Sequence, residues 1–322
     1  MVRMLSETDV RESLDLETLL DVVEETLVKQ ANGAVERPER PHFPVGRGLD
    51  GDQPLGTGLT MPAYCHGDPY FATKLVSVNK GNARRNLPTI HAQIVLTDAR
   101  TGVPEAFMGG TTITNARTGC IGGVAVRALA QDAKTLGVLG AGAQGRWQTR
   151  AIDAVTELES VRIYSPSDSR EECAADLGDE GIPASAVDSP RDAVEDADVV
   201  VTATTSREPV FPADALADGA VVVAVGAYTS EMQELESAVV DDAETVFADV
   251  PEEVAAIGDL QESSIGMDDL VPLGALLESG YTREQRDSTL VVESVGAATL
   301  DAAAAQAIYE SSEGAGTDVA LE

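Results

Sequence analysis

TLGVLGAGAQGRWQTRAI, residues 135–152, decides the fold class of this 322-residue chain. It contains Gly140, Gly142 and Gly145 as G-x-G-x-x-G, between an apolar run and a segment of helical character. In that context the glycines permit a tight strand-to-helix turn and let the backbone approach a pyrophosphate at the helix N-terminus. The sequence therefore predicts a dinucleotide-binding loop, with a turn that binds no ligand as the alternative.

Strands and helices alternate after Lys134, which is typical of a parallel sheet built from β-α-β units. The apolar runs of this half suit strands that are buried on both faces. We expect these strands over residues 135–140, 161–165, 198–204, 220–226, 245–249 and 288–296.

The first part of the chain has a different pattern. Ser6 and Asp9 predict a helix N-cap, and leucines and valines at helical spacing predict an amphipathic helix over residues 15–31. Residues 36–56, rich in Pro, Gly and charge, are expected to form a loop or short strands. We expect that the N-terminal helix covers a mostly antiparallel sheet. Its strands are predicted over residues 58–65, 70–78 and 89–98, with one more after the turn DARTG.

Two further segments are predicted to be helical. One is TTITNARTGCIGGVAVRALA, residues 111–130, and the other is the alanine-rich ATLDAAAAQAIYE, which begins at residue 298 and is expected to return to the first domain. The polar end SSEGAGTDVALE is expected to be partly disordered.

The charge of the chain excludes several classes of partner. There are 22 Lys plus Arg against 55 Asp plus Glu, so the formal net charge is −33. Such a chain repels phosphate, which argues against nucleic acid and anionic membranes as partners. The acid excess and the scarcity of lysine suggest a halophilic surface, because concentrated salt screens self-repulsion. An acidic mesophilic enzyme is the alternative.

Other residue types indicate no metal site and no membrane segment. The three cysteines are widely spaced, and the three histidines lack metal-ligand spacing. No run of 18 apolar residues occurs, and the N-terminus has no apolar signal region. We expect a cytoplasmic, soluble protein without a metal.

One lysine is in an unexpected place. Only four lysines occur, and Lys74 lies in the middle of the predicted strand YFATKLVSV. Alternation of side chains puts it on one face with Ala72, Val76 and Val78. A lysine kept inside an apolar strand is a candidate functional group.

The end of the second predicted strand bears on the choice between NAD and NADP. An acid that binds the adenosine ribose is expected about 20 residues after the glycine loop, but Ser165 stands there, followed by Ser167, Asp168 and Arg170. Hydroxyls and an arginine can accept the 2′-phosphate of NADP. Asp168 keeps NAD open.

The chain resembles the ornithine cyclodeaminase/μ-crystallin family, which includes archaeal alanine dehydrogenases. The resemblance rests on KLVSVNKGNARRNLPTIHA, GGTTITNARTG, GVLGAGAQGRWQ, VAVGAYTSEMQEL and VVESVGAAT. It implies an α/β fold in which a Rossmann-type doubly wound domain is inserted into a discontinuous α+β substrate-binding and dimerisation domain. The boundaries then fall at 1–117 plus 296–322 for the substrate and dimerisation domain and 118–295 for the dinucleotide-binding domain. A homodimer is implied as well.

The resemblance also assigns roles. Lys74 matches the active-site lysine, which burial would allow to exchange protons near neutral pH; an ion-paired interface lysine is the alternative. Arg40 matches an arginine that binds the substrate carboxylate, with Arg37 as its rival. Arg117 is expected near both the substrate carboxylate and the nicotinamide. Further cofactor contacts are expected from Thr89, Gly140, Ala141, Gly142, Ala143, Gln144, Gly145, Ser165, Thr204 and Ser294.

Two positions depart from the cyclodeaminase pattern. Leu59 stands where cyclodeaminases carry a glutamate, and Tyr228 stands where they carry an aspartate in the turn after the fifth strand. A tyrosine is a poor substitute for a carboxylate base. The substrate pocket is expected to include Met61, Tyr64 and Tyr228.

These residues give three functional hypotheses. The leading one is NAD(P)-dependent oxidative deamination of a small L-amino acid to a 2-oxo acid, as in alanine dehydrogenase, with imine or ketimine reduction as its reverse. In it Arg40 and Arg117 hold the carboxylate, and Lys74 is the general acid/base. The second is ornithine cyclodeaminase, which converts ornithine to proline and ammonia with bound NAD. The third is a non-catalytic, crystallin-like protein that binds NAD(P)H.

Overall fold

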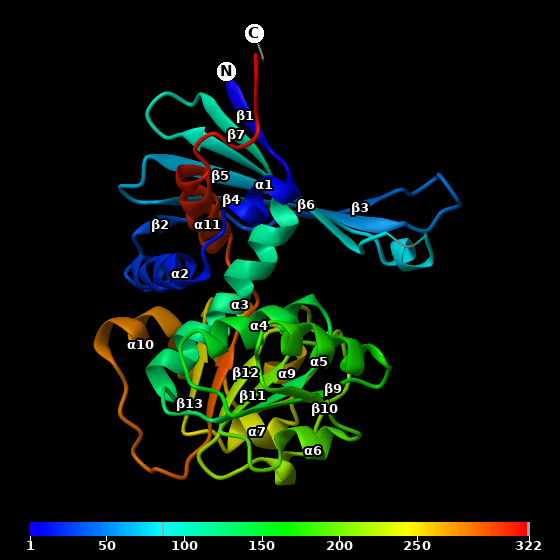
Figure 1. The fold of residues 1–322 in the computed structure, drawn as a ribbon, viewed down its shortest axis with the longest axis vertical. Coiled ribbons are helices and arrows are strands. Elements are labelled where there is room, and N and C mark those ends of the chain that lie inside the picture. The colour runs from blue at the N-terminus through cyan, green and yellow to red at the C-terminus, as the bar shows by residue number, and fades with distance from the viewer. Residues whose placement is uncertain (86, 321–322) are drawn as a thin grey trace. The chain divides into compact units, whose positions relative to one another are not determined.

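The computed structural model describes residues 1–85 and 87–320, which form two compact units (Figure 1). The first unit comprises Met1–Val22, Gly33–Arg117 and the segment from Ala298 onward, and the second comprises Val23–Asn32 and Thr118–Ala297. The division falls within two helices, α2 (Leu16–Ala31) and α3 (Gly110–Leu129), both of which the sequence predicts.

The first unit is built on a mixed sheet in the order β16-β1-β7-β6-β5-β4-β2, with β3 also paired to β4. All of its pairs are antiparallel except β1 with β7. The predicted antiparallel strands are confirmed. The strands are β1 (Val2–Leu5), β2 (Val35–Glu36), β3 (His42–Val45), β4 (Gly56–Cys65), β5 (Tyr70–Val78), β6 (Ile90–Asp98), β7 (Pro104–Gly109) and β16 (Thr317–Val319).

Helix α11 (Ala298–Ser311) is the predicted returning helix and packs on β4, β5 and β6. The first helix, α1 (Glu7–Glu12), begins with the predicted cap, since Ser6 and Asp9 form a reciprocal capping box, and it contacts β1 and β7. We expected the 15–31 helix to cover the sheet, but residues 23–32 group with the second unit instead.

The C-terminal segment contains a strand that the sequence did not predict. Within the polar end, Thr317–Val319 pairs with β1 as an antiparallel edge strand. The pairing satisfies backbone groups that local sequence alone would leave to water.

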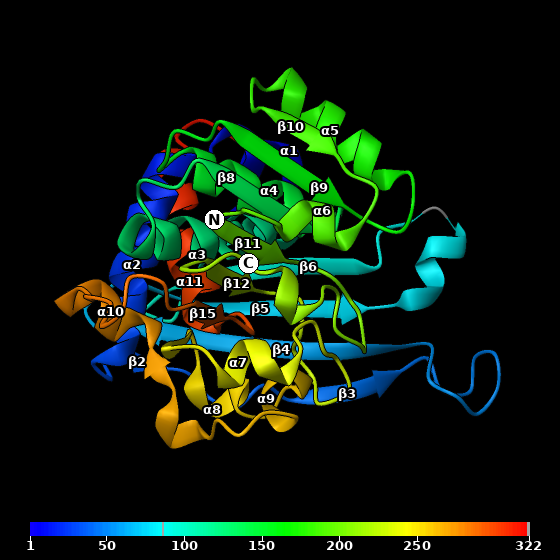
Figure 2. The same cartoon turned by 90° about the horizontal axis from the view of Figure 1, so that it is seen from below.

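The second unit has a wholly parallel sheet in the order β10-β9-β8-β11-β12-β15-β13-β14. Figure 2 labels its strands from β10 across to β15. The order reverses between β8 and β11, as in doubly wound dinucleotide-binding sheets. The predicted parallel strands are confirmed, and β10 and β14 were not predicted. The strands are β8 (Thr135–Leu139), β9 (Ser160–Tyr164), β10 (Ala184–Ala186), β11 (Val199–Thr202), β12 (Val221–Ala224), β13 (Thr245–Ala248), β14 (Val271–Pro272) and β15 (Leu290–Glu293).

Short helices connect these strands. They are α4 (Ala143–Asp153), α5 (Ser169–Asp179), α6 (Pro190–Val194), α7 (Ser237–Asp241), α8 (Pro251–Val254), α9 (Gly258–Gln261) and α10 (Leu273–Ser279).

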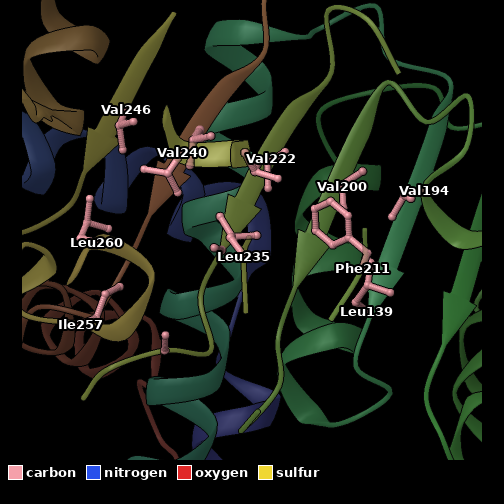
Figure 3. Packing of buried hydrophobic residues seen from close by; sticks show 14 of the residues in the cluster. Leu139, Val194, Val200, Phe211, Val222, Leu235, Val240, Val246, Ile257 and Leu260 are labelled. Atoms are coloured by element: carbon pink, nitrogen blue, oxygen red, sulfur yellow. The ribbon is translucent and has the colours of Figure 1, made fainter. Parts of the chain in front are cut away.

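A core of aliphatic side chains fixes this sheet against its helices. Val200 and Val222 come from adjacent strands, and Phe211, Leu235 and Leu260 from the segments packed over them (Figure 3). All are at least 97% buried. The strands β11 and β12 are buried along their whole length, so their carboxyl ends are rigidly placed.

No helix within residues 1–85 and 87–320 is long and apolar enough to cross a membrane.

Candidate active site

The glycine loop joins β8 to α4, and each glycine meets a different steric demand. Gly140 has φ +114°, and a Cβ there would lie 2.5 Å from the Ala203 oxygen. A Cβ on Gly145 would lie 2.0 Å from the Gly140 oxygen, so this glycine lets α4 pack against the turn. A Cβ on Gly142 would meet nothing within 4 Å. The backbone at Gly142 is therefore open to a ligand, as a pyrophosphate requires.

Other predicted cofactor residues lie at the same carboxyl edge of the parallel sheet. Ala141, Ala143 and Gln144 belong to the glycine loop itself, and Ser165 follows β9 directly. Thr204 follows β11, where its amide donates to Glu234, and Ser294 follows β15. Carboxyl ends of parallel strands are where doubly wound sheets bind dinucleotides. Thr89, by contrast, precedes β6 in the first unit.

Lys74 lies at the centre of the first unit's sheet. It pairs with Met61 on β4 and with Ile94 on β6, and its side chain is 3% exposed. Its neighbours on the same face, Ala72 and Met61 among them, are buried. The ammonium group therefore lies on the apolar face, as the alternation pattern predicts.

Helix α11 supplies the anion that makes this burial possible. The Nζ atom of Lys74 lies 2.5 Å from Oδ2 of Asp301, which is fully buried. Arg117 of α3 donates from Nε to Oδ1 of the same carboxylate at 2.8 Å and is itself 4% exposed. Two cations thus share one buried anion, and the cluster has a net charge of +1.

The start of α3, and with it Arg117, is held in place by Glu7. The two oxygens of this carboxylate accept the amides of Thr111 and Thr112 at 2.8 and 2.9 Å. Burial tends to raise the pKa of Glu7, but these hydrogen bonds outweigh it and hold the pKa below its ordinary value. A carboxylate at a helix N-terminus also interacts favourably with the helix dipole.

The electrostatics of the cluster favour proton exchange at Lys74. Burial lowers the pKa of Lys74 to about 8, Asp301 opposes this, and the positive charges of Arg117 and Arg40 lower it further. For Asp301, burial alone would raise the pKa, but Arg117 and Lys74 bring it below its ordinary value. The Asp301 carboxylate is thus ionised at neutral pH, and the Lys74 amine titrates close to neutral pH.

Arg117 has an unused donor. Its Nη1 atom is buried and has no hydrogen-bond partner within the described part of the chain. A buried guanidinium N–H without a partner costs free energy, and an incoming carboxylate would remove that cost. The cluster can therefore bind an anion beside a proton donor.

Arg40 is half-buried before β3, and its charge acts on Lys74. This brings Arg40 within electrostatic range of the cluster. Arg37, its rival in the sequence, is half-buried between β2 and β3.

The two departures from the cyclodeaminase pattern lie in different units. Leu59 of β4 pairs with Val76 of β5 and so lies on the same face of the sheet as Lys74, where it adds an apolar side chain. Tyr228 follows β12 in the second unit and is 48% exposed.

Sequence reasoning missed Asp301 and the buried carboxylates of the second unit. Asp301 is the only acid in the alanine-rich part of this helix, ATLDAAAAQA, since the other acid, Glu310, lies near the helix end, and that position among alanines was the available signal. Glu234 accepts the amides of Thr204 and Gly226 and the hydroxyl of Thr202, so it joins the loops after β11 and β12. Burial raises the pKa of Glu234 to about 7.

Asp249 has a similar role after β15. It accepts the Ser294 hydroxyl at 2.7 Å and the amides of Val295 and Gly296. The Ser294 hydroxyl is thus oriented by Asp249. Carboxylates inside this unit hold the loops that the sequence assigns to the cofactor.

The chain belongs to the ornithine cyclodeaminase/mu-crystallin family, whose model matches residues 1–316. A Δ1-pyrroline-2-carboxylate reductase of Bacillus cereus is 32% identical over 84% of this chain and 86% of its own. An alanine dehydrogenase of Archaeoglobus fulgidus is 30% identical over 95% of this chain and 94% of its own.

A solved structure shows the same fold. The Thermococcus litoralis Δ1-pyrroline-2-carboxylate reductase, in complex with NADH and L-proline, has a TM-score of 0.91 at 31% identity, with 99% of this chain and 100% of that chain covered. The predicted family, the α/β fold with a Rossmann-like domain and the class of NAD(P)-dependent oxidoreductase are confirmed.

Proposed function

We propose that this chain is an NAD(P)H-dependent reductase of small 2-imino acids, which forms the corresponding L-amino acid. The observation that carries the proposal is the buried cluster of Lys74, Asp301 and Arg117. It combines a cation with a free donor, a titrating amine and an anion that orients both.

Arg117 would bind the substrate carboxylate. Its Nη1 donor is unsatisfied, while its Nε atom is anchored on Asp301, so the guanidinium is already oriented. A charge-assisted bond to a carboxylate is stronger than one to a neutral acceptor. Arg40 would add a second positive charge on the same side of the substrate.

Lys74 would donate the proton that the imine nitrogen needs. With a pKa of about 8, roughly nine-tenths of Lys74 is protonated at pH 7, so the group is a competent acid in the reductive direction. When bound, the nicotinamide supplies the hydride. In the reverse direction neutral Lys74 accepts the proton of the amine, which requires a higher pH.

The surroundings of Lys74 favour a substrate with an apolar side chain. Leu59 and Met61, both on β4, lie on the same face of the sheet as Lys74, and neither side chain can bind a second ammonium group. Ornithine carries such a group, so Leu59 argues against the cyclodeaminase hypothesis. Tyr228 argues against it too, because a phenol is a weak base at neutral pH.

Oxidative deamination of a small amino acid is the second candidate. The similarity to an archaeal alanine dehydrogenase along 95% of the chain favours it. It uses the same cluster but needs water to add to the imine, a step in which Lys74 would also act as the acid/base.

A direct assay separates these functions. The protein, in concentrated KCl, is given Δ1-pyrroline-2-carboxylate with NADH or NADPH, and loss of the reduced nicotinamide is followed. Parallel assays use pyruvate with ammonium, and L-ornithine. Imine reduction without ammonium supports the proposal, and oxidation only with pyruvate plus ammonium supports the second candidate. Proline from ornithine without net loss of cofactor would contradict both.

Lysine variants assign the acid. Lys74→Met should abolish reduction. The control is Lys134→Met, which removes an exposed lysine of the second unit and should leave the rate unchanged. If the dinucleotide binds but no substrate is converted in any assay, the result supports the hypothesis of a non-catalytic, crystallin-like protein.

A homodimer belongs to the same proposal. Phe43 and Leu75 are 48% and 44% exposed, and their strand pairings put both on the face opposite to Lys74. Light scattering after gel filtration in concentrated salt tests the dimer.

A further inference from the structure

Three serine hydroxyls meet immediately after β9. The Oγ atom of Ser169 lies 3.2 Å from that of Ser165 and 2.8 Å from that of Ser167, and the remaining pair is 3.5 Å apart. Hydroxyls can rotate, so each can turn its proton towards an incoming anion. We call Ser165, Ser167 and Ser169 the serine group.

The serine group lies beside the glycine loop. Tyr164, the last residue of β9, pairs with Leu139 of β8, and its oxygen accepts the amide of Gly140 at 2.9 Å. The residue after this second strand is the one that meets the adenosine ribose in doubly wound sheets. Ser165 occupies that position and is 8% exposed.

A fixed cation stands next to these hydroxyls. Arg170 donates from Nη1 to the backbone carbonyl oxygen of Ser165 at 3.0 Å, which holds the guanidinium at the end of β9. Its Nε lies 3.1 Å from Glu171 and its Nη2 lies 3.7 Å from Asp188. Both carboxylates are largely in solvent, so they offset the charge of Arg170 only weakly.

The chemistry of this corner selects between the two dinucleotides. A carboxylate at Ser165 would accept the ribose 2′-hydroxyl of NAD and repel a 2′-phosphate, whereas hydroxyl and guanidinium donors suit a phosphate. Asp168 is exposed and makes no capping hydrogen bond to α5, so it is not held in the position of that carboxylate.

We propose that Ser165, Ser167, Ser169 and Arg170 bind the 2′-phosphate of NADP(H), so that the chain prefers NADP(H) to NAD(H). This rests on the dinucleotide binding of the proposed function but not on the identity of its substrate. It names the cofactor that the glycine loop leaves open.

Calorimetric binding without substrate tests the proposal separately from catalysis. In concentrated KCl, the purified chain is titrated with NADPH, NADH, 2′,5′-ADP and 5′-AMP. We expect each 2′-phosphorylated ligand to bind about tenfold or more tightly than its partner, as a charge-assisted contact to phosphate implies. Equal affinities, tighter binding of NADH, or no binding of either dinucleotide would overturn the proposal.

Two variants and a control locate the selectivity. Arg170→Gln should weaken NADPH roughly 10–100-fold and leave NADH unchanged. Ser165→Asp should reverse the preference. Arg191→Gln removes an exposed arginine of the same unit, paired with Asp214, and should change neither affinity. If Arg170→Gln weakens both dinucleotides equally, the arginine does not read the 2′-phosphate and the proposal fails.

Discussion

Asp301→Asn removes the anion that Lys74 and Arg117 share and keeps the shape of the side chain. The remaining amide has one oxygen, so it can accept from only one of the two cations, and its NH₂ group then faces the other. Removing one partner of a buried ion pair typically costs about 3–5 kcal/mol. We expect unfolding in urea at a correspondingly lower midpoint.

The same change should shift the pH dependence of reduction. An opposite charge within a few ångströms moves a pKa by about 1–3 units, so the pKa of Lys74, about 8 in the native protein, should fall to roughly 5–7. Reduction needs the protonated amine. For a shift of about two units, protonated Lys74 at pH 8 falls from about half to about 1%, which lowers kcat/KM by roughly 50-fold. The loss should shrink below pH 6, and the oxidative direction should show the opposite trend.

The assay is kcat/KM for imine reduction between pH 5 and 9 in concentrated salt. Asp259→Asn is the matched control, because it also neutralises a fully buried aspartate but belongs to the second unit, whereas Lys74 belongs to the first. The pH profile of kcat/KM for Asp259→Asn should have its inflection at the same pH as that of the unsubstituted protein. If the Asp301→Asn profile also breaks there, Lys74 is not the titrating group or Asp301 does not control it.

Three further predictions concern stability and binding. Asp259→Asn should stabilise the chain at pH 8. Burial raises the pKa of Asp259 to about 6, so ionisation of this carboxyl in the folded protein above pH 6 costs up to about 3 kcal/mol. The rise in the urea unfolding midpoint should therefore vanish towards pH 4, where the carboxyl is protonated in the folded protein. Both amide bonds to Asp259 reach Oδ1, so the amide variant keeps them. Gly142→Ala should fold normally and lose dinucleotide affinity, whereas Gly145→Ala should lose thermal stability by its clash with Gly140, as calorimetry can show. The unfolding midpoint should rise with KCl concentration, because salt screens a net charge of −33, and a midpoint independent of salt would refute the halophilic interpretation.

Local patterns predicted most of the fold because the elements of this chain carry local signals. The glycine loop, the period-2 strands and the capping box of Ser6 and Asp9 all depend on residues close in sequence. The edge pairing of β1 with β16 joins residues 2–4 to 317–319, and neither short segment identifies its partner. Contacts of this kind leave no local trace.

Three predicted strands extend at least two residues beyond their observed ends, and the reason is chemical. The strand expected over 198–204 ends at Thr202, and the one expected over 220–226 ends at Ala224, because Glu234 takes the amides of Thr204 and Gly226. After β15, Asp249 takes the next amides in the same way. An apolar run shows where a strand can continue but not where a distant carboxylate draws the backbone away.

The site itself was predicted in part. The position of Lys74 on a buried face followed from alternation, but its pKa depends on Asp301, which lies near the other end of the chain. The pairing explains why an ammonium group is stable in an apolar strand. Burial without the carboxylate would lower the pKa further, and Lys74 would then be mostly neutral at pH 7 and a much less effective acid.

The cluster and the surface of this chain respond to salt in opposite ways. The net charge of −33 repels an anionic substrate over long distances, but in 1 M salt the screening length is about 3 Å, so that repulsion disappears. Lys74, Asp301 and Arg117 are buried and in direct contact, so salt screens them much less. Concentrated salt therefore removes the barrier to anion approach and leaves the +1 charge that would receive the carboxylate in the proposed reaction. An acidic surface and a cationic site are compatible for that reason, and the few lysines of the chain include Lys74, which is the proton donor in the proposed reduction.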